Sequence, residues 1–335
     1  MELLGRDKCM RLQSAYTELA VWFYRIKGTI IRNLEILLNR GAEVDNKTLE
    51  KNLLEIIRLA STDLPPDIEN ALIAGYKREN PGSPAKSAFK TMLSSVNLSR
   101  ERNLPLCQDT GALVWHISYP DGSELLPVEK AIEKAIAKAT DKSYLRPNAV
   151  DPITGKNSGN NLGPGSPVLN FHPWKKKTWE FRLLLKGGGS ENVGAQYKLP
   201  DSSLNAGRDL DGVYKCVLDA VFKAQGKGCA PGVICVCIGG NRDTGMAKAK
   251  EQCLRKLDDI NPNPELAKLE KKLYQDCNKL GIGPMGFGGK TTVLGVKVAY
   301  LQRHPACYFV SIAYLCWSAR RATMTLKGDK AVYSV

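Results

Sequence analysis

The sequence lacks any run of 18 consecutive apolar residues, the length that indicates a membrane-spanning helix. Its most apolar early stretch, residues 19–31, is interrupted by Arg25 and Lys27. The beginning of the chain also lacks the apolar region and small-residue cleavage site of a secretory signal. We therefore expect no membrane segment and a cytoplasmic location. Basic residues outnumber acidic ones over residues 6–27, which leaves a transit peptide open as the alternative.

The chain has no CxxC pair and no spacing typical of a disulfide framework, although it contains ten cysteines. The missing CxxC pair argues against a zinc ribbon and against a thioredoxin-like redox site. Scattered cysteines in a reducing compartment are either small buried apolar residues or thiolate ligands of a metal group.

A basic tail and a nucleic-acid-binding motif are also absent, although the net charge is +14. The longest basic runs are residues 175–177 and 320–321. Lysines at helical spacing, such as Lys268, Lys271 and Lys272, favour a solvated helix face over a nucleic-acid partner. The positive field would also steer small dianions toward a cleft.

There is no internal repeat, and 43% hydrophobic with 24% charged residues is typical of a globular protein. An apolar stripe over residues 49–60 predicts an amphipathic helix, and a second helix should begin at Pro65 and Pro66. Further helices are expected at 128–140, 209–224, 245–257 and 264–280, with strands at 113–119, 179–186, 232–238, 291–300 and 307–315. The prediction is a mixed α/β (α+β) domain behind a helical N-terminal portion.

Two cysteines stand at the entrances of predicted strands, where a side chain can point into a cleft. Cys107 precedes the apolar run 112–117, and Cys229 precedes the run 233–238. Cys235 and Cys237 lie two residues apart inside an apolar run, which indicates buried core thiols. Of the others, Cys253 and Cys277 fall in predicted helices as packing or surface residues, Cys307 fits either interpretation, and Cys9 lies in the N-terminal extension.

The glycine-rich loop at 281–289 resembles two nucleotide-binding motifs without meeting the requirements of either. Its GxGxxG follows a predicted helix and precedes a strand, whereas a dinucleotide fingerprint needs the reverse order. Pro284 replaces the first glycine of a P-loop. The glycines still predict that a cluster, a substrate or a partner chain approaches this backbone closely.

Several motifs together resemble the class I iron–sulfur fumarase family. They are LPLCQDTG (104–111), RPN (146–148), GGGS (187–190), CAP (229–231), NKLGIGPMGFGG (278–289), RHP (303–305) and CWSARR (316–321). The resemblance extends from about residue 47 to about residue 327 and includes the cysteine spacing. It implies an iron–sulfur hydro-lyase domain at 47–335, behind an N-terminal extension of unknown role at 1–46.

The resemblance implies that Cys107, Cys229 and Cys316 hold a 4Fe–4S cluster in which one iron has no cysteine ligand. A cluster with four thiolates is closed and suits electron transfer. With three thiolates, the remaining iron can act as a Lewis acid toward a departing hydroxide. This chemistry suits the removal of water from malate.

The family resemblance also assigns roles around the cluster. Asp109 and His304 would belong to the acid–base apparatus, and Gln108, Arg146 and Gly189 would bind substrate. Arg146 suits a carboxylate because a guanidinium can bind it bidentately. An Asp before Thr-Gly is otherwise an ordinary turn residue, and a lone histidine is more often structural. His116 and His172 receive no role.

By this resemblance the chain is the alpha subunit of a fumarate hydratase acting on fumarate and malate. A separate beta subunit would supply the rest of the active site in a hetero-oligomer, without nucleic acid or membrane. L-Tartrate dehydratase or mesaconate hydratase is the alternative within the family. A basic nucleic-acid-binding protein with incidental cysteines is the alternative of another class.

Overall fold

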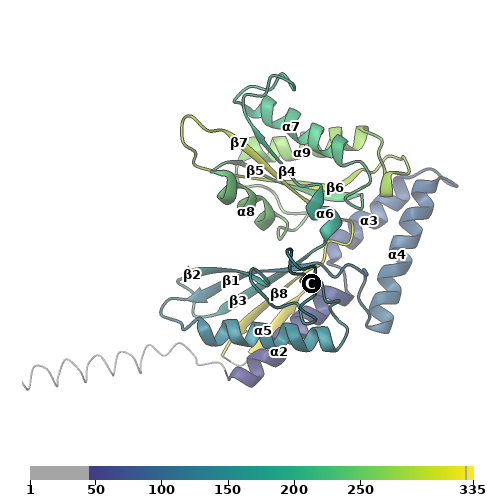
Figure 1. Cartoon of the computed structure of the whole chain (residues 1–335). Helices are drawn as coiled ribbons and strands as arrows, with labels where there is room; N and C mark the ends of the chain where they lie inside the picture. The colour runs from purple at the N-terminus through teal and green to yellow at the C-terminus, as the bar shows by residue number, and fades with distance from the viewer. Residues whose placement is uncertain (1–44, 329) are drawn as a thin grey trace, which may run out of the picture.

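The computed structural model describes residues 45–328 and 330–335. The predicted extension at 1–46 therefore lies outside the described residues apart from its last two, and Cys9 lies outside them too. The described chain confirms the mixed helix-and-sheet fold with a helical N-terminal portion. Two sheets lie one above the other in Figure 1, with helices on their outer faces.

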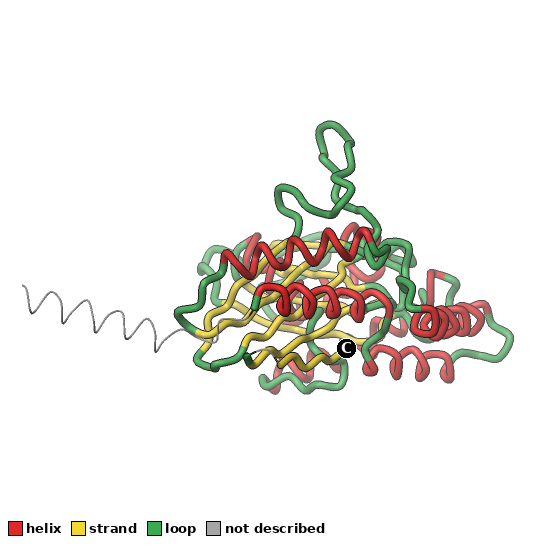
Figure 2. Tube along the Cα trace, turned by 90° about the horizontal axis from the view of Figure 1, so that it is seen from below, coloured by secondary structure: helices red, strands yellow, loops and turns green. Residues whose placement is uncertain are grey.

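The helical portion consists of α2 (Asn46–Thr62), α3 (Pro66–Arg78) and α4 (Pro84–Arg102). Asp45 caps α2 by accepting a hydrogen bond from the Thr48 amide. The predicted apolar stripe is confirmed, because its members Leu49, Leu53, Ile56, Ile57 and Ala60 are all buried. Together with α5 (Leu126–Asp141), α2 covers the outer face of the first sheet, as the view in Figure 2 shows.

The first sheet has the strand order β2-β1-β3-β8-β9. Its strands are β1 (Ala112–Pro120), β2 (Val168–Trp174), β3 (Trp179–Lys186), β8 (Arg321–Lys327) and β9 (Lys330–Ser334). Only β1 and β2 pair in parallel. Side chains alternate along β1: Trp115 and Ile117 pack against α2 and α5, while Val114 faces the second sheet.

The second sheet has the order β4-β7-β5-β6. Its strands are β4 (Ala195–Lys198), β5 (Gly232–Gly239), β6 (Val293–Leu301) and β7 (Phe309–Leu315). One face packs against α7 (Leu210–Ala224) and α9 (Pro264–Lys279), and the other against α8 (Arg242–Gln252). The short α6 (Gly188–Asn192) and the 3-10 turn η1 (Pro284–Gly286) complete the described elements.

A third apolar core fills the space between the two sheets and includes side chains of α3, α4 and α8. Cys235 and Cys237 of β5 lie in it with no exposed surface, which confirms their interpretation as buried core thiols. Cys253 lies in the same core, and Cys277 of α9 is buried in the core between α7, α9 and the second sheet. No helix of the described chain is both long and apolar enough to cross a membrane.

Candidate active site

Cys107 lies at the edge of the first sheet where β1 begins and β3 ends. Leu106 just before it donates its amide to the Ser61 carbonyl at the end of α2. Gly111 closes the turn after Cys107 with a φ of +86°. A Cβ at Gly111 would lie 2.8 Å from the Lys186 backbone, so only glycine allows β1 and β3 to approach this closely.

Cys229 and Cys316 lie at one end of the second sheet. Cys229 precedes β5, and Cys316 directly follows β7, which runs antiparallel to β5. The Trp317 amide donates to the Cys229 carbonyl at 3.2 Å and ties the two turns together. Residues 316–320 then carry the chain from β7 to β8, so this end of the second sheet meets the first sheet at Cys107.

The charges of the other two thiols act on Cys229. Burial raises the pKa of the Cys229 thiol, and the charges of Cys316, Cys107 and Asp109 raise it further. Thiols from three separate strand ends in one electrostatic environment fit a group ligated by several thiolates. Within the described residues, no three His, Cys, Asp or Glu side chains are grouped to hold a single metal ion.

Asp109 is held rigidly beside these thiols. Its Oδ1 accepts a hydrogen bond from the Gly111 amide at 2.9 Å, and its Oδ2 accepts one from the Gly188 amide at 2.6 Å. The first bond is that of an ordinary turn residue, but the second joins two distant loops. Asp109 also lines a cleft of about 970 Å³ bounded by the loop at 148–166 and by the beginning of α6.

The predicted substrate residues surround the same turn. The Arg146 amide donates to Thr110 Oγ1 at 3.0 Å, which places Arg146 next to Asp109 while its side chain is exposed. Gln108 is exposed as well. Gly189 belongs to α6, where a Cβ would lie 3.6 Å from the Lys227 carbonyl oxygen. The backbones of all three residues thus lie close to Asp109.

His304 is not brought to this site, contrary to the expectation from its motif. It follows β6 in the loop before β7, and its Nδ1 accepts the Ala306 amide at 3.1 Å. Gly239 at the end of β5 pairs with Leu301 at the end of β6. His304 therefore lies near the end of β5 that is remote from Cys229. Because β5 has eight residues, these two ends are about 25 Å apart.

Three charged groups that line the cleft, Lys186, Glu191 and Lys250, were missed from the sequence. Lys186 is 3% exposed, and its ammonium donates to Ser190 Oγ and pairs with Glu191, both at 3.1 Å. Lys250 pairs with the same carboxylate. Burial would raise the pKa of Glu191, but hydrogen bonding and charge from Lys250 and Lys186 outweigh it and lower the pKa. Lys186 ends an apolar run before three glycines, which was the available signal.

His116 and His172, which received no role from their sequence context, lie against each other on β1 and β2 with ring nitrogens 3.3 Å apart. Burial lowers the pKa of His116 to about 4, and the charge of Arg182 contributes. Lys248 lowers this pKa further and Glu251 opposes the shift, both from α8. The imidazole is therefore neutral near pH 7 and forms part of the packing between the sheets.

The glycine-rich loop at 281–289 is approached by the chain itself. A Cβ at Gly283 would lie 1.8 Å from the Gly288 carbonyl oxygen, and one at Gly226 would lie 2.5 Å from the Met285 carbonyl oxygen. The Lys290 amide donates to both carboxylate oxygens of Glu79 at 3.0 Å. A carboxylate thus occupies the donor that a phosphate would need, which argues against a phosphate cradle.

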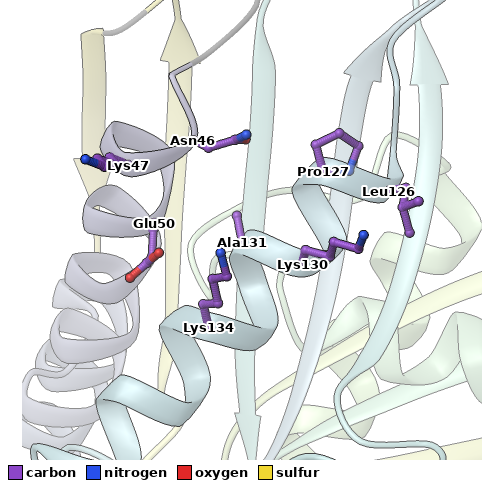
Figure 3. A pocket seen from close by; sticks show the side chains of 8 residues that line it. All are labelled: Asn46, Lys47, Glu50, Leu126, Pro127, Lys130, Ala131 and Lys134. Atoms are coloured by element: carbon purple, nitrogen blue, oxygen red, sulfur yellow. The ribbon is translucent and has the colours of Figure 1, made fainter.

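A second hollow of about 320 Å³ lies between the N-terminal ends of α2 and α5 (Figure 3). Lys130 and Lys134 of α5 lie across from Lys47 and Glu50 of α2 in this view. Cys107 is adjacent to the opposite end of α2. Because α2 has 17 residues, that end is about 25 Å from the hollow. The hollow is therefore separate from the cysteine site.

Comparison with known proteins decides the family. The sequence profile described as fumarate hydratase (Fumerase) matches residues 50–325. The chain belongs to the class I fumarate hydratase and tartrate dehydratase alpha family. This is a hydro-lyase family whose fumarate hydratases are in general iron–sulfur enzymes.

Three relatives illustrate the range of the family. A provisionally named class I fumarate hydratase of Geobacillus stearothermophilus is 48% identical over 82% of this chain and 54% of its own length. A provisionally named L(+)-tartrate dehydratase subunit alpha of Methanocaldococcus jannaschii is 35% identical over 83% and 97%. The L(+)-tartrate dehydratase subunit alpha of Escherichia coli K12 is 29% identical over 86% and 95%. The chain thus spans about half of the first relative and nearly all of the other two.

Proposed function

We propose that this chain is the alpha subunit of a fumarate hydratase that interconverts fumarate and L-malate with a separate beta subunit. Cys107, Cys229 and Cys316 would hold a 4Fe–4S cluster with one iron free of cysteine. The observation that carries the proposal is that the Cys229 and Cys316 turns are joined by a backbone hydrogen bond and that Asp109, two residues after Cys107, lines the cleft. The family assignment favours this hydro-lyase function over a nucleic-acid-binding role.

The bound cluster would supply a Lewis-acidic iron for the hydroxyl group that leaves malate. The other steps fall to the protein. Asp109 is held by two amides in one orientation, so it can accept or return a proton at a fixed place in the cleft. Arg146, with Gln108 and the backbone at Gly189, would bind a substrate carboxylate. His304 receives no role here because it lies beyond the far end of β5.

The beta subunit is proposed on two grounds. The two relatives whose length this chain covers almost completely are named as alpha subunits. Gln108, Arg146 and Gly188, all beside Asp109, are exposed in the isolated chain. Stabilisation of charge in a transition state is strongest where water is excluded, so a second protein surface over these residues would improve catalysis.

L-Tartrate dehydratase is the second candidate activity, because two of the three compared relatives carry that name. Fumarate is preferred because the most identical of the three compared relatives is named a fumarate hydratase, and because the glycine-rich loop at 281–289 resembles that of fumarases. Mesaconate is a further substrate to test. All nine cysteines of the described chain are free, which supports the proposed reducing, cytoplasmic compartment.

The test is anaerobic co-expression of this chain with a beta-subunit gene, followed by assays with fumarate, malate, tartrate and mesaconate. The chain alone, loaded with the same amount of iron, is the control. We expect fumarate hydration only in the presence of both chains. Activity restricted to tartrate would replace the proposed substrate, and full activity of the chain alone would refute the two-subunit assignment.

A further inference from the structure

Arg320 is the most deeply buried charged side chain at the cysteine site. It is 1% exposed, and its Nε and Nη1 have no hydrogen-bond partner among the described residues. Its neighbour Arg321 is 6% exposed but forms an ion pair with Asp67. Two consecutive arginines are thus both buried, and only the second has a carboxylate partner in the described chain.

The guanidinium of Arg320 lies beside the Asp109 turn. A Cβ built on Gly187 would be 3.7 Å from Arg320 Nη2 and 3.2 Å from Asp109 Oδ2. Both groups therefore border the same small space, although no ion pair within 4.0 Å joins them. The backbone is fixed here as well, since the Arg320 carbonyl accepts the Leu185 amide at 3.0 Å.

Arg320 is also close to one of the three cysteines along the chain. Arg320 is four residues after Cys316, on the segment that joins the two sheets, and Asp109 is two residues after Cys107. The side chains described as lining the cleft include Asp109 and Gly188 but not Arg320. The guanidinium thus lies close to Asp109 without lining the cleft that the substrate would enter.

A buried charge without a partner destabilises a fold, and a buried donor without an acceptor adds to that cost. Three thiolates and the Asp109 carboxylate, by contrast, place several negative charges at one junction. Arginine suits such a place because it stays protonated and presents five donors in a rigid plane. Hydrogen bonds and charge near the sulfurs of an iron–sulfur cluster raise its reduction potential and stabilise it.

We propose that Arg320 is the internal cation of the three-cysteine site: it balances the charge of the group held by Cys107, Cys229 and Cys316 and donates hydrogen bonds to it. This inference rests on the proposed function, because it requires a thiolate-ligated cluster. It makes Arg320 a positioning residue, which acts through the cluster and does not contact substrate.

The experiment compares Arg320→Gln with the matched control Arg321→Gln, both in the full chain with its beta subunit. Arg320→Gln removes a charge that has no partner, so it should leave the melting temperature of the iron-free protein unchanged or raise it. Arg321→Gln should lower that temperature, because Asp67 loses its buried partner. With the cluster loaded anaerobically, Arg320→Gln should lose iron at least about tenfold faster than the wild type under a chelator and show a lower reduction potential.

Arg320→Lys provides a second variant that keeps the charge but loses the planar donors. Its reduction potential should return toward the wild-type value, while its iron retention should stay intermediate. Iron retention and potential equal to wild type in Arg320→Gln would overturn the inference. So would an iron-free Arg320→Gln protein that unfolds as readily as Arg321→Gln. A wild-type protein that holds no cluster would instead overturn the proposed function, so the two failures are distinguishable.

Discussion

Substituting Gly111 by alanine should destabilise the Cys107 turn by two separable effects. The φ of +86° disfavours an L side chain by about 1–2 kcal/mol. The added Cβ would also lie 2.8 Å from the backbone of Lys186, and overpacking of this kind costs about 1–3 kcal/mol. The total loss in the free energy of unfolding is therefore about 2–5 kcal/mol.

Gly82→Ala is the matched control. Gly82 has a φ of +74° but nothing within 4 Å of the position of its Cβ, so only the backbone effect applies. Guanidinium unfolding of the iron-free proteins would measure both losses. Gly111→Ala should lose more stability than Gly82→Ala and should also bind less iron, because its turn carries Cys107 and Asp109. Equal losses for the two variants would refute the close approach of β1 and β3.

Cys316→Ser should abolish stable iron binding while Cys235→Ala retains it, as iron analysis of anaerobically purified protein would reveal. Brief exposure to air should produce a 3Fe–4S signal in electron paramagnetic resonance and remove activity, and an air-stable enzyme would count against an open iron. Asp109→Asn should lower kcat by about 10²–10⁴-fold, whereas Asp121→Asn, at an exposed turn where the carboxylate accepts the amide of the next residue, should not change it. His116 has a folded pKa of about 4 against 6.5 in the unfolded chain, so the unfolded chain binds its proton first. Stability should therefore fall by about 3 kcal/mol as the pH drops from 6.5 to 4, and unfolding at both pH values should show a smaller fall in a His116→Gln variant.

Patterns that depend on neighbouring residues predicted much of the fold. The stripe in α2 and the period-two thiols of β5 were both readable, because one buried face imposes its period on the sequence. The helix α4 was missed because serine, asparagine and arginine interrupt its apolar face. Strand β2 was missed because none of its residues is fully buried and Pro173 interrupts its pattern. Strand β4 has four residues, too few for any period to appear.

The site was only partly predictable, because its geometry depends on which sheet ends meet. Placing Cys107 and Cys229 at strand entrances was enough to expect both in a cleft, and the structure places both in turns at strand beginnings. His304 follows a strand of the same sheet, and its motif alone could not tell that this strand end points away from Cys229. The contrast between Arg320 and Arg321 is invisible in the sequence, since it depends on Asp67 in a distant helix.

The spectrum of the reduced, anaerobically purified two-subunit protein tests the central claim most directly. Electron paramagnetic resonance should show a 4Fe–4S signal that changes when malate is added, because substrate would reach an iron that no cysteine ligates. The signal should be absent in Cys316→Ser. A protein without a cluster signal, or with one that malate leaves unchanged, would contradict the assignment of Cys107, Cys229 and Cys316 as the catalytic centre.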